Sequence, residues 1–161
     1  MAIYFPNQNI QEINGMLNPT GGTVVQIVES RSTNTVACAN WSTANFLFNG
    51  SITPRSTANK VLVYVFIPFR MDAGAGAWSL AYMTVTNNAG SQIMNSGWNG
   101  TWRNNIHSWQ KQYLDSPAST SAQTYSVYGY NYPSGTCYYN NYGGVQASDQ
   151  YMYIRMTEIS A

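Results

Sequence analysis

Apolar and polar residues form short segments over most of the chain, either alternating or continuously apolar, with turn-forming residues between them. Residues 23–29 alternate, and turns are indicated by Asp115-Ser116-Pro117 and by Tyr132-Pro133-Ser134-Gly135. A period of two is typical of β-strands, and no long segment has the period of a helix. The pattern predicts about ten strands, at residues 23–29, 33–39, 46–53, 60–71, 78–86, 91–95, 106–114, 124–131, 136–141 and 150–159.

Short strands at regular spacing favour an all-β fold, an antiparallel β-sandwich of the jelly-roll kind. We assign this sandwich to a single domain at residues 21–161. A segment rich in Trp, Gly and Asn, at residues 97–105, is expected to be a loop between two of its strands.

The strand at residues 60–71 is apolar at every position from Val61 to Ile67, without alternation. Such a run is typical of a strand that is buried on both faces. Because only one face of a sandwich strand fills the core, we expect a subunit interface to cover the other. The residues assigned to this interface are Val61, Val63, Val65, Ile67, Tyr125 and Tyr153.

Residues 1–20 differ from the rest, since Asn, Gln and Pro are mixed there with isolated apolar residues. Three of these, Ile10, Ile13 and Leu17, have the spacing of one side of a short helix. We interpret this segment as an arm that lies on a neighbouring subunit or another partner, the alternative being a floppy terminus. Its anchoring residues would be Ile3, Tyr4, Phe5, Ile10, Ile13 and Leu17.

The composition changes the picture because only 8% of the residues are charged, against about 25% in an ordinary soluble domain. The net charge is +1 and the basic residues are scattered, so nucleic-acid binding is not expected. A chain so close to neutral is poorly protected against self-association. No apolar run is long enough to cross a membrane, and residues 1–7 lack the features of a signal peptide, so we expect folding in the cytoplasm.

Groups that carry chemistry are few. His107 is the only histidine and has no cluster of Cys or carboxylates beside it, so we predict no metal site and no cofactor. A triad with Asp115 or Asp149 would lack any nucleophile motif, and nothing pairs the carboxylates as a glycosidase requires, so we predict no enzyme. Cys38 and Cys137 are isolated; we expect two buried free thiols, the alternative being a late disulfide.

Aromatic residues in and near the expected loops are a possible sugar platform, because rings stack on pyranose faces while amides bond to hydroxyls. The residues concerned are Trp98, Asn99, Trp102, Trp109, Tyr130 and Tyr139. The competing interpretation is that these rings pack against neighbouring subunits, where Tyr and Trp are common.

Four segments of the chain read GTVVQIV (residues 22–28), ITPRSTANKVLV (52–63), YLDSPASTSAQTYSV (113–127) and YIRMTEI (153–159). Together they resemble a family of phage virion proteins from marine and freshwater phages. The family's corresponding patterns are GgvvQvV, ITPsSasSKILV, YLDSPaTTSAtTYkV and ITLMEI. The resemblance implies a jelly-roll-like sandwich, trimeric, exposed on a phage particle.

Two functions are consistent with the resemblance. The first is a capsid decoration (cement) protein, a homotrimer on the virion surface whose arm binds the major capsid protein. The start at Met1, the compact size and an arm in place of a shaft favour it. The alternative is the receptor-binding head of a tail fibre, which would dock on a fibre or baseplate protein and hold host glycans. A secreted lectin is a third possibility, against which the missing signal peptide counts.

Overall fold

The computed structural model describes residues 22–39, 43–72, 78–97, 99–102, 106–132, 135–140 and 151–161. Within these ranges the chain forms strands and no helix. The strands are β1 (Val24–Ser32), β2 (Val36–Cys38), β3 (Asn45–Ile52), β4 (Lys60–Asp72), β5 (Trp78–Thr86), β6 (Gln92–Asn95), β7 (Asn99–Trp102), β8 (Ile106–Asp115), β9 (Gln123–Tyr132), β10 (Thr136–Tyr139) and β11 (Met152–Ile159).

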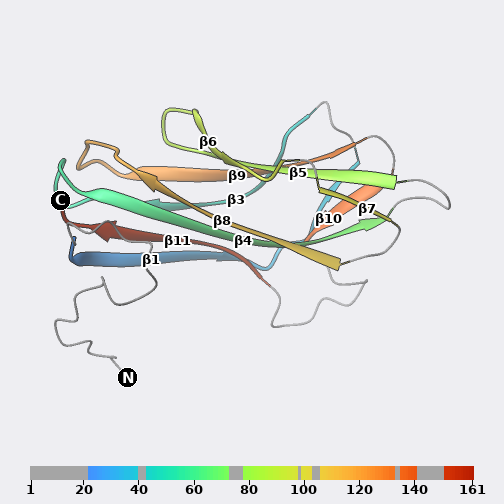
Figure 1. Cartoon of the computed structure of the whole chain (residues 1–161), viewed down its shortest axis with the longest axis horizontal. Helices are drawn as coiled ribbons and strands as arrows, with labels where there is room; N and C mark the ends of the chain where they lie inside the picture. Colours follow the sequence, from blue (N-terminus) through green and yellow to red (C-terminus); the bar gives the residue numbers. More distant parts are fainter. Residues whose placement is uncertain are drawn as a thin grey trace, which may run out of the picture.

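The strands form two antiparallel sheets, which Figure 1 shows as two layers. In the first, sheet A, the order is β1-β11-β4-β8, and β10 and β2 extend it beside the second half of β4. In the second, sheet B, the order is β3-β9-β5-β6, with β7 also paired to β5. Without β2, β7 and β10, this is the order of an eight-stranded jelly roll. The predicted fold class is therefore confirmed.

The core lies between the sheets and is filled by alternate residues of their strands. Val61, Val63, Val65 and Ile67 of β4 have no exposed surface, and neither has Tyr125 of β9. These five residues were assigned to the subunit interface, and the structure corrects that assignment, because they face the opposite sheet of their own chain. A run that is apolar at every position does not show which half of it faces inward.

The even-numbered residues of the same strand lie on the outer face of sheet A. Leu62, Tyr64 and Phe66 are half-buried there, so these are the positions of β4 that a second molecule can reach. Tyr153 of β11 is opposite Phe66 and lies on the same outer face. It is the one residue assigned to the interface that the structure places at the surface.

The predicted strands agree with the structure except in detail. The segment at residues 97–105 was expected to be a loop, yet it contains β7, which pairs with β5 from Trp78↔Trp102 to Ala81↔Asn99. The sequence does not predict this strand because it contains Asn and Gly, both of which are rare in strands. The predicted arm at residues 1–20, with all of its anchoring residues, lies outside the described part of the chain.

Candidate functional site

The outer face of sheet A carries an aromatic cluster. Tyr153 is its centre: the Phe66 ring stacks on it with centroids 5.5 Å apart, and the rings of Tyr64 and Tyr151 lie at 5.7 and 5.8 Å. Ile27 of β1, on the same face, is 60% exposed. This face therefore presents rings and aliphatic groups to solvent over three adjacent strands.

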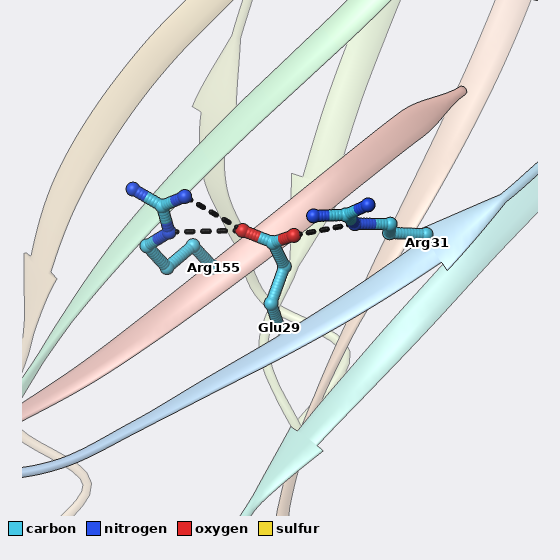
Figure 2. Close-up of polar contacts among 3 residues, drawn as sticks. All are labelled: Glu29, Arg31 and Arg155. Carbon is cyan, nitrogen blue, oxygen red and sulfur yellow. Dashed lines mark hydrogen bonds and ion pairs between the residues drawn. The ribbon is translucent and has the colours of Figure 1, made fainter. Parts of the chain in front are cut away.

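A small charged group of Glu29, Arg31 and Arg155, which Figure 2 shows, borders this cluster. The Glu29 carboxylate accepts hydrogen bonds from Arg31 Nε at 2.6 Å and from Arg155 Nη2 at 2.7 Å. Partial burial raises the pKa of Glu29, but the two arginines lower it by more, so the net pKa is below its ordinary value. The guanidinium groups also lie over rings, Arg31 over Tyr151 at 4.4 Å and Arg155 over Tyr153 at 5.7 Å. Two cations against one anion leave the patch positive.

The edge strand β8 is exposed on both of its faces. Ile106, Tyr113 and Leu114 are 47%, 40% and 42% exposed, and Trp109 is its one buried residue. The side chain of Lys111 crosses toward sheet B, where its Nζ donates to the backbone oxygen of Asn95 at 3.0 Å. Exposed apolar groups are thus concentrated on a strand at the margin of the sandwich.

The outer face of sheet B carries two aromatic pairs. Phe46 and Tyr128 make an edge-on contact with centroids 5.9 Å apart, and Tyr82 and Tyr130 make a similar contact at 5.7 Å. Phe46 is 52% exposed. This surface includes Tyr130, which was assigned to the sugar platform.

The other residues of the predicted sugar platform do not come together on one surface. Trp109 is 8% exposed and Tyr139 has no exposed surface; the Tyr139 hydroxyl donates to the backbone oxygen of Tyr130 inside the sandwich at 2.8 Å. Both residues are therefore removed from the candidate platform. Trp98 lies outside the described residues, and Asn99 and Trp102 are at the two ends of β7.

The groups considered for catalysis are far apart. His107 and Asp115 are eight residues apart on β8, about 26 Å at the rise of a strand. The Asp115 carboxylate accepts a hydrogen bond from the Tyr125 hydroxyl at 2.8 Å, and Asp149 is outside the described ranges. In the part of the chain that the structure describes, no three of His, Cys, Asp and Glu form a group suited to a metal ion.

The two cysteines are directly opposite each other on neighbouring strands, Cys38 on β2 and Cys137 on β10. Both are buried free thiols. Burial raises the pKa of Cys38 to about 12, so this thiol stays protonated at neutral pH. A protonated thiol is a poor nucleophile.

A buried carboxylate holds the loop between β3 and β4, at residues 53–59. Glu158 of β11 has no exposed surface. Its Oε1 accepts hydrogen bonds from the Arg55 backbone N–H at 2.7 Å and from Asn59 Nδ2 at 2.6 Å, while Oε2 accepts from Gln26 Nε2 at 2.6 Å. Burial raises the pKa of Glu158, but these hydrogen bonds lower it by more, so the net pKa is below its ordinary value. We call this arrangement the Glu158 clamp.

The segments that carry the phage resemblance meet at one end of the sandwich. Strand pairing places Lys60 beside Ile159, and Val61 beside Asp115. The first of these two strand ends is fixed by the Glu158 clamp and the second by the hydrogen bond from Tyr125 to Asp115. β1 also begins at this end, where the C-terminus lies (Figure 1). Chain entry and both motif loops therefore share one end.

None of the residues described here forms a helix long and apolar enough to cross a membrane. No protein-family model matches the sequence, and no curated protein matches it significantly.

Solved structures of infectious bursal disease virus are similar in fold. The crystal structure of its T13 viral particle has a TM-score of 0.47 and 9% identity, covering 89% of this chain and 40% of that one. The structure of the Gx strain has a TM-score of 0.46 and 9% identity over 89% and 43%. The VP2 subviral particle has a TM-score of 0.45 and 10% identity over 86% and 39%. The chain thus spans less than half the length of these neighbours, and at such scores their assembly says nothing about its function.

Proposed function

We propose that the protein is a non-enzymatic structural component of a phage virion, a capsid decoration protein that binds the outside of the head and stabilises it. One observation carries the proposal. The segments that resemble phage virion proteins, including loops 53–59 and 116–122, gather at the end of the sandwich where the chain enters β1. An arm in residues 1–20 would leave the domain from this same end, which we infer to be the end that faces the capsid.

The mechanism is mechanical. The apolar residues of the arm bind the major capsid protein, and the domain holds the arm at the capsid surface. Several weak contacts made together hold far more tightly than one, because each bound contact raises the effective concentration of the others. Binding to the assembled shell and not to its separated subunits stabilises the shell by mass action.

The test is deletion of residues 1–19, followed by co-sedimentation with empty phage heads. We expect the shortened protein to keep its β-sheet circular dichroism and to lose head binding. A matched control is the full chain with Phe46→Ser, which alters an exposed ring on the outer face of sheet B and should leave head binding unchanged. Head binding by the shortened protein at the full-length level would refute the assigned role of the arm.

A second candidate function is the receptor-binding head of a tail fibre, attached to a fibre or baseplate protein. The aromatic pairs on the outer face of sheet B favour it, since exposed rings are what a sugar ring stacks on. Here Phe46→Ser and Tyr130→Ala should abolish binding to host cells, while deletion of residues 1–19 should not. Density for the protein in a particle reconstruction, on the head or on the tail, distinguishes the two functions directly.

A further inference from the structure

Strand β8 is an unusually open edge of the sandwich. It pairs with β4 in an unbroken register from Val61↔Asp115 to Arg70↔Ile106, and no other described strand pairs with it. An open edge leaves a row of backbone N–H and C=O groups free to pair with another chain. A ten-residue edge with no bulge is a long template for such pairing.

The other edges are protected in ways that natural proteins use against such pairing. β1 and β3 each contain a bulge, and β1 also carries Glu29 and Arg31. β2 has three residues, and β6 and β7 have four each. Among the described edge strands, β8 alone is both long and regular.

Exposed apolar side chains point to the same strand. Five large hydrophobic residues are exposed in the described ranges. Three of them, Ile106, Tyr113 and Leu114, belong to β8, and the other two are Ile27 of β1 and Phe46 of β3. Ile106 and Leu114 lie on the outer face of sheet A, near the two ends of β8, with the exposed polar residues Gln110 and Gln112 between them. Because the strand is apolar at both ends and polar in the middle, a second copy that runs antiparallel to it presents apolar residues to apolar ones and polar residues to polar ones.

We propose that a second copy of the chain pairs with this one antiparallel through β8, about a two-fold axis at Gln110. In this register Ile106 of each copy is opposite Leu114 of the other copy, and the two Gln110 residues are opposite each other. Both apolar ends are then covered by the same contact. A shift by two residues places Leu114 opposite Ser108 and leaves Ile106 without an apolar neighbour, so the side chains select the register.

The inner face of β8 agrees with the same register. His107 is opposite Tyr113 of the second copy, and Trp109 is opposite Lys111. The first is a pair of rings, a favourable pairing across strands, and no two like charges are opposite each other. The two copies of residues 106–114 make nine residue pairs, which alternate between hydrogen-bonded and non-hydrogen-bonded pairs and together give the contact its stability.

The contact is independent of the proposed function, because an edge of this kind pairs whatever the protein binds. A two-fold contact joins the copies of the chain in even numbers, whereas the phage resemblance implies an assembly of three copies. The two expectations therefore differ in the mass of the assembly in solution.

A register-specific disulfide tests the proposal. Directly opposite Cα atoms are about 4.5–5.5 Å apart, within the range of a disulfide, so Gln110→Cys pairs with itself across the axis. Gln112→Cys is the matched control, because its symmetry mate is four residues out of register, about 13 Å away. In the reaction the two introduced thiols form the S–S bond. The two electrons and two protons that they give up reduce one oxidised glutathione to two molecules of reduced glutathione.

We expect sedimentation equilibrium of the native chain to give an even multiple of 17.9 kDa. Oxidation should convert most of Gln110→Cys into a covalent dimer on a denaturing gel and leave Gln112→Cys largely single. Leu114→Lys should reduce the assembly to smaller species, whereas Ile27→Lys, at an exposed position on β1, should not. An odd multiple, a single subunit, equal cross-linking of the two cysteine variants or an unchanged Leu114→Lys would each overturn the proposal. Head binding is measured separately, so failure here leaves the proposed function standing.

Discussion

Replacing Glu158 by Gln tests the Glu158 clamp most directly. The amide keeps one acceptor oxygen, which can serve Arg55 and Asn59, but its NH₂ group then faces Gln26 Nε2. Rotating the Gln26 amide is no remedy, because the same Nε2 also donates to the Thr53 backbone oxygen at 2.7 Å. One donor therefore opposes another in a buried site.

The cost follows from the hydrogen bonds lost and weakened. A hydrogen bond to a charged group contributes about 1.5–3 kcal/mol and a neutral one about 0.5–1.5 kcal/mol. The variant loses one bond of the first kind and converts two others into the second kind. Part of this is offset because a neutral amide is less costly to bury than a carboxylate. We expect a net loss of about 2–4 kcal/mol in the free energy of unfolding, a decrease of about 1–2 M in the urea midpoint.

The pH dependence of the free energy of unfolding distinguishes the loss of the Glu158 charge from a change in side-chain shape. The pKa of Glu158 is lowered on folding from its ordinary value of 4.5, so the carboxylate stabilises the fold fully above that value. The contribution is lost as pH falls through the lower, folded-state pKa. The difference in urea midpoint between the native chain and Glu158→Gln should therefore shrink steadily from pH 5 downward.

Glu29→Gln is the matched control, since the pKa of Glu29 is also lowered but its ion pairs are at the surface. Its cost at pH 7 should stay below about 1 kcal/mol. Equal urea midpoints for Glu158→Gln and the native chain at pH 7 would refute the reasoning. So would a difference that does not change between pH 7 and pH 3.

Two further substitutions probe the backbone. A Cβ on Gly129 would clash with the buried ring of Tyr139, so Gly129→Ala should cost about 1–3 kcal/mol and lower the melting temperature. Adding Tyr139→Leu should recover part of the loss, and fully additive effects of the two substitutions would contradict the contact. Ala118 has a φ of 48°, so Ala118→Gly should raise the free energy of unfolding by about 0.5–1 kcal/mol. Ala122→Gly, in the same loop, should lower it, and the same sign for both variants in urea unfolding would refute this.

Much of the fold could be predicted because it depends on local pattern. The period of two and the turn residues fixed the strands, and Trp78–Thr86 agrees with its strand to the residue. What failed locally was β7, where Asn99 and Gly100 conceal a strand that exists through its pairing with β5.

The faces of the strands were decided only by the tertiary structure. In β4 every residue from Val61 to Ile67 is apolar, so the pattern fits equally well whether the odd-numbered or the even-numbered residues face the core. The odd-numbered residues face the core because of the register of β4 with β11 and β8. The same holds for the open edge, since whether a strand is central or at the margin depends on pairing between residues far apart in the chain. The Glu158 clamp likewise joins Gln26, Arg55 and Glu158. Local sequence determines which segments form strands. Contacts between residues far apart in the sequence determine which face and which edge of each strand is exposed to solvent.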